Sequence, residues 1–115
     1  MPNGDLLFKA KIVQLIIAGQ VDEALSMLSH HYGVDSPHLK VGMPKGHRGK
    51  AGCYVPKTET IHIINHEKIR DPFIILHEFY HHLRTFGGKH KGTEKNADKF
   101  AKDFIEAYRN FANVQ

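Results

Sequence analysis

Glycine and proline are concentrated in the middle of this 115-residue chain, between two stretches that can form helices. Both residue types break helices, because proline lacks the amide hydrogen and glycine has a large backbone entropy to lose. The breakers are Pro37, Gly42, Pro44, Gly46, Gly49, Gly52 and Pro56. The sequence therefore predicts an α+β fold, with short strands in the middle and helices on either side.

Two helices are predicted before the middle stretch. Apolar residues recur at helical spacing from about Asp5 to Ala18, and Gly19 then favours an end to the first helix. A second apolar stripe predicts a helix from about Val21 to His31, with Gly33 as its stop signal.

Two further helices are predicted after the middle stretch. Asp71 can cap the free amides of a helix that begins at Pro72 and runs to about Phe86. Thr93 is the matching cap for a last helix, from Glu94 to about Phe111.

Three short strands are expected between these helices. They run from about Leu39 to Val41, from Gly52 to Val55 and from Thr60 to Ile64, with a turn at Pro56–Glu59. We expect them to form a small, mostly antiparallel sheet. The glycine-bearing stretch Lys45–Lys50 is strongly basic and predicts a loop.

The composition is that of one globular domain, predicted to span residues 1–115. Lysines interrupt the first apolar stretch, and no run approaches the roughly 20 apolar residues that a membrane helix needs. With a single cysteine, Cys53, these features predict a cytoplasmic protein. The net charge of +4 permits nucleic-acid binding, although a solvated basic surface is favoured. Oligomerisation stays open.

The motif His77-Glu78-Phe79-Tyr80-His81 carries the chemistry. His77 and His81 are one helical turn apart, so both rings can bind one zinc ion. Glu78 is offset by about 100° around the helix and can take a proton from a zinc-bound water. An apolar face is predicted opposite the histidines, formed by Ile75, Leu76, Phe79, Leu83 and Phe86.

A catalytic zinc usually has a third protein ligand and one open position. Glu94 is the leading candidate, because the last helix can fold back against the motif helix. Asp98 lies one turn further on and can accept a hydrogen bond from a ligand histidine, or exchange roles with Glu94. His90 and His82 are rival ligands, and His82 points about 100° away from His81.

These stretches resemble the gluzincin metallopeptidases, in which a glutamate ligand follows H-E-x-x-H on the next helix. The length and the region Gly52–Phe111 are similar to the archaeal minigluzincins and to the IrrE/ImmA-type peptidase domain. The resemblance implies a zincin-like fold with a substrate peptide on the edge of strand Thr60–Ile64. It also implies latency, with the C-terminal segment Asn110–Gln115 blocking the cleft.

The leading functional hypothesis is therefore a zinc endopeptidase that acts on a peptide or protein, with Glu78 as its general base. The group that stabilises the oxyanion is left open among Tyr54, Tyr80, Tyr108, His66 and His90. Two alternatives stay open as well. One is an IrrE/ImmA-like regulator of a transcriptional repressor or nucleic acid, and the other is a catalytically inactive zinc-binding domain.

Overall fold

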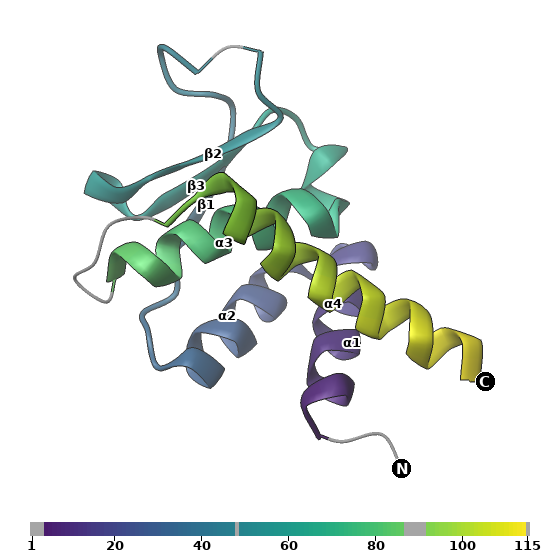
Figure 1. The fold of residues 1–115 in the computed structure, drawn as a ribbon. Coiled ribbons are helices and arrows are strands. Elements are labelled where there is room, and N and C mark those ends of the chain that lie inside the picture. Colours follow the sequence, from purple (N-terminus) through teal and green to yellow (C-terminus); the bar gives the residue numbers. More distant parts are fainter. Residues whose placement is uncertain (1–3, 48, 87–91, 115) are drawn as a thin grey trace.

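The computed structural model describes residues 4–47, 49–86 and 92–114. These residues form a small α+β fold in which a mixed three-stranded sheet lies against a group of helices (Figure 1). The helices and strands are α1 (Gly4–Ile17), α2 (Val21–Tyr32), β1 (His38–Val41), β2 (Gly52–Val55), β3 (Thr60–Ile63), α3 (Pro72–Phe86) and α4 (Glu94–Val114). Two short 3₁₀ helices, η1 (Pro56–Thr58) and η2 (Lys68–Arg70), precede β3 and α3.

Glycines end the first two helices, as predicted. Gly19 and Gly33 have φ angles of +87° and +71°, a left-handed conformation that is costly for other residues. The Gly33 amide donates to the carbonyl of His30, which satisfies one of the free carbonyls of α2. The turn between β2 and β3 is likewise where it was expected, as η1.

The sheet has the strand order β1-β3-β2, with β3 parallel to β1 and antiparallel to β2. The prediction of a mostly antiparallel sheet is therefore wrong for one of its two pairs. The chain leaves β1 and crosses to the far edge of the sheet. It then turns through η1, so that β3 enters the centre in the direction of β1.

This order also changes where a peptide can pair with the sheet. Since β3 bonds to a strand on each side, the predicted pairing of a substrate with the edge of Thr60–Ile64 is wrong. Among the described strands, β2 is the edge that packs beside α3.

The core lies between the sheet and the helices. Its fully buried side chains come from all layers: Ile12, Ile16, Leu25, Leu28, Ile61, Ile63, Ile75, Leu76, Phe79 and Phe104. Burial of each such side chain contributes about 1.5–3 kcal/mol to folding. In Figure 1, α3 lies under the sheet, while α4 crosses from α3 to α1. The helix α3 is thus held between the sheet and α4.

The apolar face predicted for α3 is correct for its first two turns. Ile75, Leu76 and Phe79 have no exposed surface, but Phe86, the last residue predicted for this face, keeps 39% of its surface exposed. His82 is fully buried instead. Its ring finds hydrogen-bond partners inside the protein, which makes burial of a polar group tolerable.

The last helix is longer than predicted and ends far from its first residue. It continues through Val114, and its Phe111 and Ala112 lie beside α1. At 1.5 Å per residue, Asn110 lies about 24 Å along the axis from Glu94. The segment predicted to block the cleft is thus helical and remote from Glu94 as far as Val114, while Gln115 lies outside the described residues.

No helix in the described ranges combines the length and the apolar character needed to cross a membrane.

Candidate metal centre

The side chains of His77 and His81 lie one turn apart in the middle of α3. The helix begins as predicted, with Asp71 Oδ1 accepting the Phe73 amide at 3.0 Å. The two imidazole ring centroids are 5.1 Å apart, at an interplanar angle of 72°. Both side chains are largely enclosed, with 12% and 4% of their surface exposed. The histidine pair is therefore a fixed feature of the helix rather than a pair of solvated side chains.

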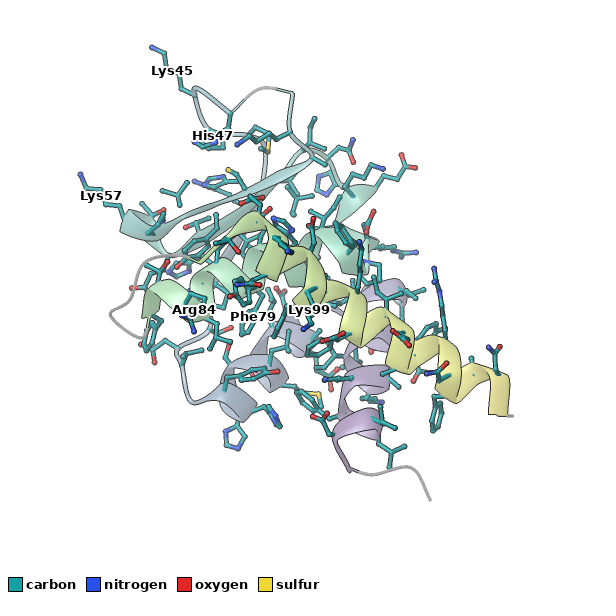
Figure 2. The ribbon with its side chains drawn as sticks, viewed as in Figure 1. Lys45, His47, Lys57, Phe79, Arg84 and Lys99 are labelled. Carbon is teal, nitrogen blue, oxygen red and sulfur yellow. The ribbon has the colours of Figure 1, made fainter. Side chains whose placement is uncertain are left out.

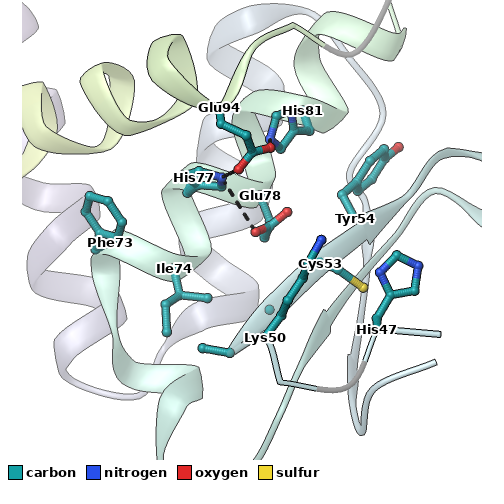
Figure 3. A pocket seen from close by; sticks show the side chains of 12 residues that line it. His47, Lys50, Cys53, Tyr54, Phe73, Ile74, His77, Glu78, His81 and Glu94 are labelled. Atoms are coloured by element: carbon teal, nitrogen blue, oxygen red, sulfur yellow. Dashed lines mark hydrogen bonds and ion pairs between the residues drawn. The ribbon is translucent and has the colours of Figure 1, made fainter. Parts of the chain in front are cut away.

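Glu94, the first residue of α4, lies across both histidines (Figure 3). Its Oε2 is 2.8 Å from His77 Nε2, and its Oε1 is 2.9 Å from His81 Nε2. The capping prediction is correct here, since Thr93 Oγ1 accepts the Asn96 amide at 3.1 Å. The structure therefore brings the three predicted ligands together.

Asp98 holds the other side of the His77 ring. Its Oδ1 lies 2.8 Å from His77 Nδ1, in the geometry predicted for a residue that orients a ligand. A carboxylate only accepts, so the hydrogen of this bond must come from Nδ1. A neutral His77 ring then presents a lone pair at Nε2, toward Glu94.

The nitrogen lone pair of His77 and the carboxylate oxygens of Glu94 are thus directed toward the same small region. A lone pair on His77 Nε2 and a carboxylate oxygen of Glu94 repel each other at 2.8 Å unless positive charge joins them. Either a proton on the ring or a cation supplies that charge. Two imidazole nitrogens and one carboxylate form a donor set that zinc accepts well. Ligand atoms of His77, Glu78 and His81 lie within 4.8 Å of one another, so this group could hold a metal ion, and the Glu94 carboxylate reaches both histidines beside it.

Glu78 also faces this region. Its Oε2 is 3.9 Å from His77 Nε2, and only 8% of the residue is exposed. Burial raises the pKa of Glu78 above its ordinary value. The charges of His77 and His81 oppose this rise, and that of Glu94 adds to it. A carboxylate with a raised pKa is suited to accept a proton near neutral pH.

Glu94 has the opposite tendency. Desolvation favours its neutral form, but hydrogen bonds and charges of His77 and His81 outweigh that effect and lower the pKa of Glu94. Its side chain is 73% exposed, which also keeps it ionised. The two glutamates therefore differ in proton affinity, as a ligand and a base should.

A cleft of about 370 Å³ opens in front of these residues. One wall is α3, with Phe73 and Ile74 beside the motif, and the other wall is formed by β2 and the loop before it. Gly52 permits the close approach of the two walls, because a Cβ there would lie 2.7 Å from Ile74 Cγ2. This role was not predicted, although an isolated glycine in a strand pattern signals close backbone approach.

His82 is not a rival ligand, because both of its ring nitrogens are engaged elsewhere. Its Nε2 lies 2.7 Å from the carbonyl oxygen of Asp35, which can only accept, so Nε2 donates. Nδ1 then accepts the hydroxyl hydrogen of Tyr54 at 2.7 Å. Burial foremost, with the charge of Glu59, raises the pKa of Tyr54 to about 12.

The structure shows which of the candidates for stabilising the oxyanion lie near the cleft. Tyr54 lines the cleft, but its hydroxyl hydrogen is directed to His82. Tyr108 faces α1, and Tyr80 packs on Phe100 without lining the cleft. His66 is exposed and outside the cleft.

The remaining candidate, His90, which was also a rival ligand, lies outside the described residues. The cleft residues that were not anticipated are His47, Lys50, Ala51, Cys53, Phe73 and Ile74, besides Gly52. The sequence signals for them were the basic character of the loop at Lys50 and the isolated glycine in the strand pattern at Gly52.

Comparisons of the chain with known protein families, with curated proteins and with solved structures find no match. The function must therefore be argued from the geometry of the site.

Proposed function

We propose that this protein is a zinc metallopeptidase in which His77, His81 and Glu94 bind the metal and Glu78 is the general base. The observation that carries the proposal is the position of the Glu94 carboxylate, within 2.9 Å of both Nε2 atoms. Asp98 supports it by orienting the His77 ring. Three protein ligands leave a position for water, whereas a structural zinc site is normally closed by four.

Zinc bound there would polarise a scissile carbonyl and lower the pKa of a water molecule. Glu78 takes a proton from that water and then delivers it to the leaving amine. Its burial supports both steps, because a raised pKa makes the carboxylate a better base and its acid form available as a donor. Asp98 keeps the Nδ1 proton of His77 in place throughout.

The resemblance to gluzincins, including the archaeal minigluzincins, supports this assignment through the same residues. In such a zincin-like arrangement a peptide substrate pairs with a strand beside the motif helix. In this fold we assign that role to the edge strand β2, whose residues line the cleft.

The proposal is tested by measuring zinc content and peptide hydrolysis on the same samples. We expect about one zinc per chain by mass spectrometry of the metal. Hydrolysis of a peptide library should stop with a chelator and return with zinc. Glu78→Gln should retain zinc and lose hydrolysis by at least about 10²-fold, the lower end of general-base contributions. Loss of zinc in this variant would contradict the role of Glu78.

A regulator of the IrrE/ImmA kind, acting on a repressor or nucleic acid, is the second candidate. The observation in its favour is the exposed Lys45, whose side chain projects from the loop before β2 (Figure 2). DNA binding that weakens steeply with salt and is reduced by Lys45→Glu would support this function. Zinc content without either activity would indicate the inactive zinc-binding domain.

A further inference from the structure

The wall of the cleft opposite α3 carries a lysine that the mechanism above does not use. Lys50 lies just before β2, and its ammonium points across the cleft toward Glu78 (Figure 3). Among the described residues that line the cleft, it is the one lysine or arginine. The cation therefore faces the reacting groups.

Lys50 has no acidic partner in the described part of the chain. Ion pairs there join Lys9 to Asp5 and the site histidines to carboxylates, and none includes Lys50. Lys50 is exposed, so its ammonium can pair with an anion that enters the cleft.

The backbone beside Lys50 is held by the sheet. The next carbonyl, that of Ala51, accepts the Ile64 amide at 2.9 Å, and β2 begins one residue later. His47 lines the same wall, and its enclosed Nδ1 has no hydrogen-bond partner among the residues that the structure describes. The loop wall therefore combines the exposed Lys50, whose backbone neighbour is bonded to the sheet, with a second nitrogen-bearing side chain.

The two walls of the cleft differ in their ionisable side chains. Glu78 and Glu94 lie on the helix wall, where zinc would offset their negative charge, and apart from that metal the wall has no lysine or arginine among its described residues to hold a substrate carboxylate. The loop wall has Lys50, whose ammonium is a compact charge with three donors. A carboxylate on a bound peptide is consequently directed to the loop wall.

We propose that the cleft selects peptides with a carboxylate next to the cleaved bond, and that Lys50 pairs with this carboxylate. The inference rests on the proposed peptidase function and names its substrate class. The carboxylate is either an aspartate or glutamate side chain or the free C-terminus of the peptide. Both offer the same chemistry to Lys50.

Two peptide series distinguish these sources with the zinc-loaded protein. One has amidated ends and glutamate, glutamine or lysine at each position around the cleaved bond. The other has no acidic side chain and a free C-terminus at varied distance. In at least one series, we expect the peptide with the carboxylate to have a kcat/KM about 10-fold or more higher than the corresponding peptide in which that group is uncharged.

Charge changes at position 50 test the assignment to this residue. Lys50→Met should remove the preference for the carboxylate, and Lys50→Glu should reverse it toward lysine-containing peptides. Lys57→Glu is the matched control, because Lys57 is exposed in η1 and outside the cleft (Figure 2). It makes the same change in net charge and should leave the preference intact.

Binding to the Glu78→Gln protein separates failure of this inference from failure of the peptidase function. Fluorescence anisotropy should show tighter binding of carboxylate peptides, which Lys50→Met in the same background removes. That result without any hydrolysis by the wild type would support the inference while the peptidase function fails. Hydrolysis with no carboxylate preference, or with one that survives Lys50→Met, would overturn the inference. An equal loss of kcat on all peptides would also overturn it, because Lys50 would then act on the transition state.

Discussion

Asp98 binds the His77 ring of the proposed metal centre at the nitrogen that faces away from Glu94. Its carboxylate fixes the proton of His77 on Nδ1, so that Nε2 faces Glu94 and the cleft. Without that bond the ring can rotate or change tautomer, and the ligand geometry is lost part of the time.

Asp98→Asn should therefore weaken zinc binding about 10–100-fold, the usual effect of losing such a partner. Competition with a fluorescent chelator measures the affinity directly. Asp103→Asn is the control, because Asp103 is an exposed residue of the same helix that does not line the cleft. Equal affinities for the Asp98 and Asp103 variants would contradict the orienting role.

Tyr54 offers a pH-dependent test of the buried pair that it forms with His82. Its pKa of about 12 lies above the ordinary 10.0, so the native protein holds a proton that the unfolded chain loses between these values. The stabilisation is complete below pH 10 and disappears as the pH rises toward 12.

Tyr54→Phe removes this titration and leaves His82 Nδ1 without its donor, at a cost of about 1–3 kcal/mol near neutral pH. The difference in unfolding free energy between wild type and variant should shrink from pH 10 to pH 12. Urea unfolding across that range measures it. A difference that is constant with pH would show that the Tyr54 pKa is not raised by folding.

At the scale of elements, the cleft depends on how closely β2 approaches α3. Gly52 makes that approach possible, and Ile74 occupies the space that a side chain at position 52 would need. Small side chains are also buried on α4, which packs against α3 and α1: Ala97 and Ala101 are fully buried. These close contacts determine the positions of the two walls of the cleft and of Glu94.

Gly52→Ala should destabilise the protein by about 1–3 kcal/mol through overpacking against Ile74. The added Ile74→Ala change removes the clashing methyl group, so the double variant should lose less than the sum of the single changes. Gly4→Ala is the control, since nothing lies within 4 Å of a Cβ there. Additive losses in thermal unfolding would mean that the two residues do not compete for space.

At the scale of the whole molecule, the candidate ligands join two helices that are separate in the chain. If zinc is held by α3 and α4 as proposed, it would bind the native state and not the unfolded chain, and so would stabilise the fold. At free zinc of 100 times Kd this linkage amounts to about 2.7 kcal/mol.

The melting temperature should therefore rise with zinc and fall with a chelator, as measured by calorimetry. The doubly substituted His77→Ala/His81→Ala protein should show no rise. A similar zinc effect on that variant would place the metal elsewhere in the molecule.

The sequence alone determined the local part of this architecture. Helix ends followed from Gly19, Gly33, Asp71 and Thr93, because caps and left-handed glycines act over a few residues. The spacing of His77 and His81 placed both rings on one face for the same reason. The strands were located nearly to the residue, but their order was not, because pairing joins segments distant in the chain.

Only the tertiary structure decided which side chains meet. It placed Glu94 across both histidines, buried His82 in place of Phe86, and made β2 rather than β3 the edge beside the cleft. It also placed Lys50 across the cleft from Glu78, which lies 28 residues later in the sequence. Such contacts depend on how helices and strands pack, and periodicity within one segment carries no information about the segment that will face it.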